Sequence, residues 1–106
     1  MLNTITVMGR MCADPELRYT ANQKPVANFT VAIERDRDRE EADFIDVVAW
    51  NGTAEFVSKY FKKGSMIVVN GRLQMRKYEA KDGAKRTTYE IVSNNVYFGE
   101  AKRDGA

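Results

Sequence analysis

Alternation of apolar and polar residues recurs in five separate segments of the chain, and only one segment has helical periodicity. The alternating segments cover residues 3–11, 26–33, 44–50, 66–78 and 87–92, and a continuation over 95–98 would lengthen the last. Residues 53–63 instead place Phe56, Val57, Tyr60 and Phe61 on one helical face. A period of two is typical of strands with one buried face, and a period of 3.6 of an amphipathic helix. The pattern therefore predicts an all-β domain with a single α-helix.

The number and order of these elements predict the fold. Five strands with one α-helix between the third and fourth, in a chain of 106 residues, match a small Greek-key barrel of the OB-fold type. The helix would close one end of the barrel. Segment 12–25 has the turn signals of a loop, and Lys81-Asp82-Gly83 those of a tight hairpin. We expect one domain over residues 1–98 and a short polar tail over 99–106.

Histidine is absent and Cys12 is the only cysteine, which removes most catalytic and metal chemistry. Structural zinc sites, Ser-His-Asp triads and Cys-His dyads all require residues that the chain lacks. Only carboxylate and lysine chemistry remains open to an enzyme, and we expect a protein that is not an enzyme, with no catalytic residue, metal site or cofactor. No apolar run approaches the roughly 18 residues that span a bilayer, and the polar start does not resemble a signal peptide. We expect a cytoplasmic protein without membrane contact.

Positive charge is concentrated in one part of the chain. The net charge is −4 over residues 1–58, +7 over residues 59–86 and −1 over residues 87–106. A strongly basic segment within a nearly neutral chain is either a solvated face or a surface for an anionic partner.

Aromatic and basic side chains share the faces that the core does not need. Phe44 and Trp50 lie on one face of their strand, whereas Ile45, Val47 and Ala49 supply the other. The helix or a second subunit could cover the two aromatic side chains. Alternatively, nucleobases could stack on them. Strand 66–78 has an apolar face with Ile67, Val69, Leu73 and Met75, and a polar face that ends in Arg72, Arg76 and Tyr78. This combination favours a single-stranded nucleic acid.

The segment 34–43 alternates acidic and basic residues. Its acids are Asp36, Asp38, Glu40, Glu41 and Asp43, and the arginines Arg35, Arg37 and Arg39 lie between them. Clustered carboxylates could hold Mg²⁺ for phosphodiester cleavage, so a metal-dependent nuclease is one alternative function. Because the arginines compete for the same carboxylates, a self-paired polar hairpin is favoured.

Several stretches of the sequence also resemble a known family. DPELRYT (14–20), VANFTVA (26–32), FKKGS (61–65) and GRLQMRKYE (71–79) are similar to the DNA-binding domain of bacterial single-stranded DNA-binding proteins, within a resemblance that covers roughly residues 1–98. The resemblance implies an OB-fold, a homotetramer, and sequence-independent binding of single-stranded DNA in replication, recombination and repair, in the bacterial cytosol or nucleoid. Full-length members usually continue into an acidic tail that recruits partner proteins, and this sequence ends before such a tail.

The residues and the resemblance together assign roles in binding. Carried over by position, the stacking aromatics are Phe44, Trp50 and Tyr78. The family usually has a further aromatic in the loop after the second strand; its position falls near Arg37, and this chain has no aromatic residue between Phe29 and Phe44. We expect phosphate contacts from basic side chains, namely Arg35, Arg37, Arg72, Arg76, Lys77, Lys81, Lys85 and Arg86. A second alternative is an OB-fold interaction module of a replication assembly, whose aromatic face docks a protein.

Overall fold

A computed structural model of the chain describes residues 1–36 and 41–100. Its elements, in chain order, are β1 (Ile5–Met11), β2 (Glu16–Tyr19), β3 (Pro25–Glu34), β4 (Ala42–Trp50), α1 (Asn51–Tyr60), β5 (Met66–Glu79) and β6 (Lys85–Phe98). The all-β prediction with one helix is confirmed. Arg37 and most of the expected polar tail lie outside the described residues.

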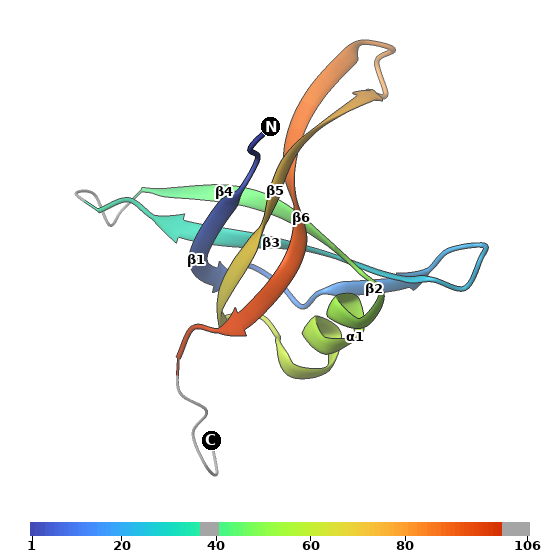
Figure 1. Cartoon of the computed structure of the whole chain (residues 1–106). Coiled ribbons are helices and arrows are strands. Elements are labelled where there is room, and N and C mark those ends of the chain that lie inside the picture. The colour runs from blue at the N-terminus through green and yellow to red at the C-terminus, as the bar shows by residue number, and fades with distance from the viewer. Residues whose placement is uncertain (37–40, 101–106) are drawn as a thin grey trace.

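Five of the strands close into a barrel (Figure 1). The sheet order is β1-β5-β6-β4-β3-β2, and β1 also pairs with β3 through Arg10↔Ala32 and Met11↔Val31. β4 and β6 are parallel neighbours, while the other pairs are antiparallel. This closed Greek-key arrangement is the OB-fold that the sequence predicts.

The short strand β2 was not expected, because segment 12–25 has the composition of a loop. Glu16 to Tyr19 pair with β3 from Glu16↔Asn28 to Tyr19↔Pro25, although all four β2 residues are exposed. Its residues do alternate between polar and apolar, but the run is only four residues long and lies between turn signals, so the sequence does not separate it from a loop. Its presence corrects the strand count to six, so that α1 follows the fourth strand in chain order.

The core lies inside the barrel and extends to the helix. It contains residues from every barrel strand together with Ala54, Val57 and Phe61. The helix begins at Asn51 and ends at Tyr60, earlier at both ends than the predicted range 53–63. Apolar residues at helical spacing thus cover one end of the barrel.

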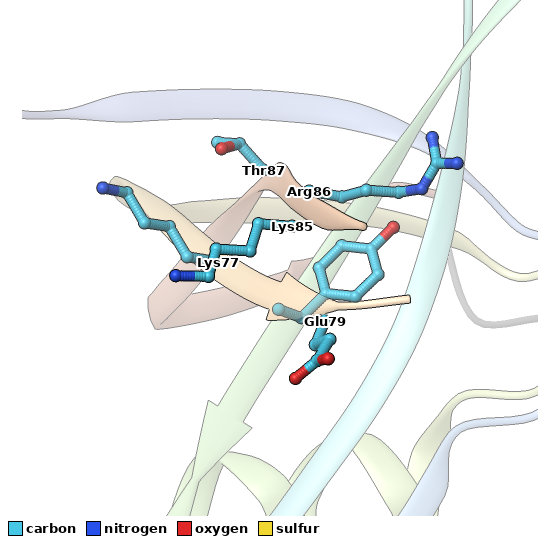
Figure 2. A pocket seen from close by; sticks show the side chains of 6 residues that line it. Lys77, Glu79, Lys85, Arg86 and Thr87 are labelled. Carbon is cyan, nitrogen blue, oxygen red and sulfur yellow. The ribbon is translucent and has the colours of Figure 1, made fainter. Parts of the chain in front are cut away.

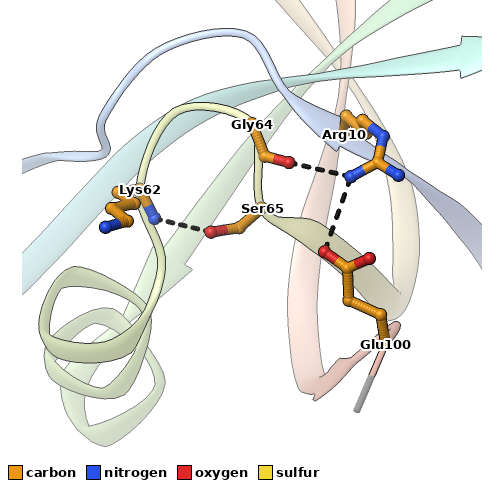
Figure 3. Close-up of polar contacts among 5 residues, drawn as sticks. All are labelled: Arg10, Lys62, Gly64, Ser65 and Glu100. Atoms are coloured by element: carbon orange, nitrogen blue, oxygen red, sulfur yellow. Dashed lines mark hydrogen bonds and ion pairs between the residues drawn. The ribbon is translucent and has the colours of Figure 1, made fainter. Parts of the chain in front are cut away.

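The loop between α1 and β5 is tied to β1 and to the end of the described chain (Figure 3). Arg10 Nη1 donates to the Gly64 carbonyl at 3.0 Å and contacts a Glu100 carboxylate oxygen at 3.5 Å. Nearby, the Lys62 N–H donates to Ser65 Oγ at 3.1 Å. These contacts hold the helix end against the barrel. Among residues 1–36 and 41–100, no helix has the length and hydropathy to cross a membrane.

β5 and β6 continue beyond the barrel as a projecting hairpin (Figure 1). We call residues 72–89 of this hairpin the arm, since residues 90–92 of β6 still pair with β4 in the barrel. The pairing shifts register next to Gly71, where a Cβ atom would lie 2.1 Å from the Val92 carbonyl oxygen. The hairpin turn is confirmed: the Gly83 N–H donates to the Ala80 carbonyl at 2.9 Å, with Gly83 at φ 84°.

Because the arm leaves the barrel, the apolar face predicted for strand 66–78 is only partly buried. Ile67 and Val69 are fully buried in the core, whereas Leu73 and Met75 are exposed. The apolar face of this strand therefore belongs to the core only before Gly71. The outer, polar face of the same strand continues without interruption onto the arm.

Candidate nucleic-acid interface

The outer face of β4 carries two exposed aromatic side chains. Phe44 is 67% exposed and Trp50 is 42% exposed, while Val47 and Ala49 on the opposite face are buried. The helix α1 begins directly after Trp50 but leaves both aromatic rings accessible within the described part of the chain. The helix therefore does not cover this face, and the explanation that it buries both aromatics is wrong.

Strand pairing extends this face across the sheet from β3 to the arm. The parallel pairing of β4 with β6 places Asp46 beside Glu90 and Val48 beside Val92. The antiparallel pairing of β6 with β5 then adds Arg72↔Val92, Gln74↔Glu90, Arg76↔Thr88 and Tyr78↔Arg86. Since directly opposite residues share a face, these side chains form one surface, which we call the outer face.

A cleft of about 320 Å³ on the outer face brings together residues that are far apart in the sequence. Trp50 from β4 and Arg76 from the arm both line it, as predicted binding residues, together with Arg18 from β2. Arg18 Nη2 donates to Asn28 Oδ1 at 3.0 Å, which orients its guanidinium. The remaining lining residues are Tyr19, Thr20, Val26, Asn28, Val48 and Glu90.

Arg18 and Tyr19 are candidate binding residues that the sequence analysis missed. The turn signals of segment 12–25 predict a loop, and a loop assigns no face to its side chains. The available signal was an arginine next to a tyrosine within DPELRYT, one of the stretches that carry the family resemblance. Only the pairing of β2 with β3 shows that this segment borders the cleft.

The arm adds a second, shallow groove near its turn (Figure 2). The groove has a volume of about 490 Å³ and is lined by Lys77, Tyr78, Glu79, Lys85, Arg86 and Thr87. Tyr78 is 43% exposed, and the Arg76 guanidinium lies 5.8 Å from the centre of its ring. That distance suits a cation–π interaction, which orients both side chains.

The basic residues of the arm divide between its two faces. Arg72, Arg76 and Arg86 share the outer face with Tyr78, whereas Lys77 and Lys85 belong to the opposite side of the hairpin by register. Figure 2 shows Lys77 and Lys85 extending in one direction and Arg86 in the other. Lys81 lies in the turn. The structure thus brings three of the predicted phosphate contacts to the aromatic side chains and places three others around the arm.

Arg35 has acidic partners within its own hairpin. Its Nη2 lies 2.9 Å from Asp43 Oδ1, and its Nη1 lies 3.9 Å from Glu41 Oε2. The hydrogen bond and the charge attraction raise the pKa of Arg35 and lower the pKa of Asp43. The self-paired hairpin predicted for this segment matches these contacts, and they reduce the availability of Arg35 to phosphate.

The acidic side chains of the described residues bear on the metal-dependent alternative. Within residues 1–36 and 41–100, no group of three or more histidine, cysteine, aspartate and glutamate side chains is arranged to hold a metal ion. Asp38 and Glu40, which belong to the acidic segment of the nuclease alternative, lie outside those ranges. The described geometry therefore adds no support to metal-dependent cleavage.

Comparisons with known proteins agree with this geometry. The model of the Single-strand binding protein family matches residues 2–99. A single-stranded DNA-binding protein of Fusobacterium nucleatum is 43% identical over 95% of this chain and 69% of its own length. Single-stranded DNA-binding protein 3 of Listeria innocua is 44% identical over 100% of this chain and 69% of its own length.

A third relative, single-stranded DNA-binding protein A of Bacillus subtilis, is 44% identical over 99% of this chain but only 63% of its own length. This chain thus spans about two thirds of the curated relatives it matches. A family model that covers nearly every residue, together with similarity along the whole chain, leads to one conclusion. The chain belongs to the single-strand binding protein family.

Proposed function

We propose that this protein binds single-stranded DNA, largely independently of sequence, by stacking bases on Phe44, Trp50 and Tyr78. The observation that carries the proposal is the outer face itself, where two exposed aromatic rings on β4 share one surface with the arginines and Tyr78 of β5 and β6. Stacking on an aromatic ring contributes about 1–3 kcal/mol per base and tolerates any base, because every base has a π-face. The names of the relatives support the same ligand.

The spacing of the aromatics suits a flexible strand with accessible bases. Phe44 and Trp50 are six residues apart on one strand, which corresponds to about 20 Å. A single base cannot reach both rings, so they form separate stacking positions. In a duplex the base faces are stacked on one another, and readers of duplex DNA usually place a helix or ribbon in the major groove. The only helix of the described residues is packed against the barrel end.

Phosphate contacts would come from both sides of the arm and from β2. Arg18, Arg72, Arg76 and Arg86 border the aromatic side chains, and Lys77, Lys81 and Lys85 lie around the end of the hairpin. Arg35 is a weaker candidate because it already contacts Asp43. Arg37 stays a prediction from the sequence. If Z phosphates are contacted, the logarithm of the binding constant should fall with the logarithm of salt concentration at a slope near −0.7Z.

The chain's single tryptophan provides the direct test. We expect oligo(dT) to quench Trp50 fluorescence strongly at low salt, with an affinity that falls as salt is added. A duplex of equal length should bind much more weakly. Absence of quenching, equal affinity for duplex, or an affinity that does not respond to salt would contradict the proposal. The last result would instead favour an aromatic face that docks a protein.

The biological setting follows from the same binding mode. A protein that holds exposed strands would protect them and prevent re-annealing during replication, recombination and repair, in the bacterial cytosol or nucleoid. Such a role involves no bond cleavage. Labelled single-stranded DNA incubated with the protein and Mg²⁺ should therefore remain intact, and degradation that co-purifies with the protein would refute this part of the proposal.

Self-assembly into a homotetramer is supported by a second exposed surface. On the side of the barrel formed by β1, β5 and β6, the residues Met8, Val68 and Tyr97 are direct neighbours across three strands. Met8 and Tyr97 are exposed and apolar, as expected where copies of a chain meet. Light scattering should give four times the chain mass of 12.1 kDa. Tyr97→Lys should reduce that mass, and a wild-type monomer at all concentrations would contradict the assembly.

A further inference from the structure

Glu90 is a buried carboxylate within the cleft that also contains Trp50. Its residue exposure is only 8%, yet it lines the cleft together with Trp50, Arg18 and Arg76. The nearest cationic group recorded in the described part of the chain is Arg76 Nε, at 3.9 Å from Glu90 Oε1. That separation allows charge attraction but exceeds a hydrogen bond. The Glu90 carboxylate therefore has acceptor capacity left for a ligand.

A second carboxylate strengthens the negative character at this point. Asp46 is the β4 neighbour of Glu90, and its Oδ1 accepts a hydrogen bond from the Thr30 hydroxyl at 2.9 Å. Two adjacent carboxylates repel phosphate, so the backbone of a bound strand must pass along the arginines at the border of the cleft. The base edge, rather than the phosphate, is then the part of a nucleotide that faces Glu90.

A carboxylate discriminates among base edges. It accepts hydrogen bonds from exocyclic amino groups, such as cytosine N4–H. Thymine has no amino group, and its single edge donor, N3–H, lies between two carbonyl oxygens that repel a carboxylate. A buried polar group that finds no partner lowers the affinity for the ligand that fails to supply one. Glu90 should thus favour cytosine over thymine at this one position.

We propose that the cleft is a base pocket in which a nucleobase stacks on Trp50 and donates its amino hydrogen to Glu90. Arg18 and Arg76 contact the flanking phosphates. This inference rests on the proposed function and adds a local base preference to otherwise sequence-independent binding. Glu90 would act as a specificity-determining residue.

The test compares labelled oligo(dC) and oligo(dT) of equal length by fluorescence anisotropy at neutral pH. For Glu90→Gln, the ratio of the oligo(dT) to the oligo(dC) dissociation constant should fall about fivefold or more. A good side-chain hydrogen bond to a base edge favours the matching base over the wrong one by about that factor. The glutamine amide can also donate to thymine O4. Glu55→Gln is the matched control, because it makes the same charge change at an exposed position of α1, outside the outer face, and should leave the ratio unchanged.

A ligand change tests the same contact in the unaltered protein. An oligonucleotide of deoxy-2-pyrimidinone lacks only the amino group of cytosine, so its affinity for the wild-type protein should fall toward that of oligo(dT). This measurement decides the question if Glu90→Gln does not fold. Unchanged ratios with Glu90→Gln, or full affinity for the pyrimidinone, would overturn the base pocket while the proposed function stands. Failure of every oligonucleotide to bind would instead refute the proposed function.

Discussion

Phe44→Ala should separate DNA binding from folding, because most of this side chain is exposed. Of about 200 Å² for a phenylalanine, the 67% exposure of Phe44 leaves about 65 Å² buried. At about 25 cal/mol per Å², its removal costs at most about 1.6 kcal/mol of folding free energy. Trp50 is 42% exposed, so about 145 Å² of the roughly 250 Å² of a tryptophan is buried, and the same coefficient gives about 3.6 kcal/mol. Phe44 is therefore the cleaner position to change.

The effect on binding should be larger than the effect on folding. Loss of one stacking contact weakens binding by about 1–3 kcal/mol, which raises the dissociation constant about 5-fold to 150-fold. Because Trp50 remains in the variant, its fluorescence still reports the titration with oligo(dT). We expect a full quenching amplitude at saturation, with the midpoint shifted to higher oligonucleotide concentration. Urea denaturation gives the folding free energy of the same sample.

Tyr60→Ala provides the control for this experiment. Tyr60 is 48% exposed and lies on α1, outside the outer face, where its ring centre is 5.0 Å from that of Phe56. Removal of the Tyr60 ring should lower the free energy of unfolding but leave the dissociation constant for oligo(dT) unchanged. The reasoning fails if Phe44→Ala binds within twofold of the wild type while folded, or if Tyr60→Ala weakens binding to the same extent.

Two further predictions concern stability and charge. Gly71→Ala should destabilise the protein by more than about 1–3 kcal/mol in urea denaturation, because the added Cβ atom would lie 2.1 Å from the Val92 carbonyl oxygen. Gly52→Ala should stabilise it by roughly 0.5–1 kcal/mol, because Gly52 lies in α1 and an added Cβ atom there would have no atom within 4 Å. Equal effects of the two substitutions would refute the argument. Arg35 lowers the pKa of Asp43, so their contribution to stability is present above the ordinary carboxyl pKa and is lost as pH falls through the lowered value. Asp43→Asn should remove this loss of stability from the acid side of the pH–stability profile. Because the substitution also releases Arg35, it should tighten oligo(dT) binding. An unchanged profile would show that the pair does not contribute to stability.

Local periodicity predicts which side chains share a face. The alternation over 44–50 correctly separated Val47 and Ala49, which are buried, from Phe44 and Trp50, which are exposed. It succeeded because a strand presents successive side chains to opposite faces whatever its partners are. It failed for β2, because an alternating run of only four residues between turn signals cannot be told from a loop, and all four residues are exposed.

Periodicity also failed where the chain leaves the barrel. Leu73 and Met75 continue the apolar face of β5, but no other strand of the described chain buries them once the arm projects beyond the core. Burial depends on what lies opposite a face, and that is a property of the whole fold. The same limit applies to Arg35, whose partner Asp43 becomes its neighbour only across the β3–β4 hairpin.

The sequence by itself determined the strand faces, the single helix, the basic segment and the three aromatic candidates, because all of these depend on residues close together in the chain. The tertiary structure alone decided which candidates act together. Parallel pairing of β4 with β6 sets Glu90 beside Asp46, and the β2–β3 pairing brings Arg18 to the cleft with Trp50 and Arg76. Pairing between distant strands depends on the packing of the entire barrel, so no local pattern records it.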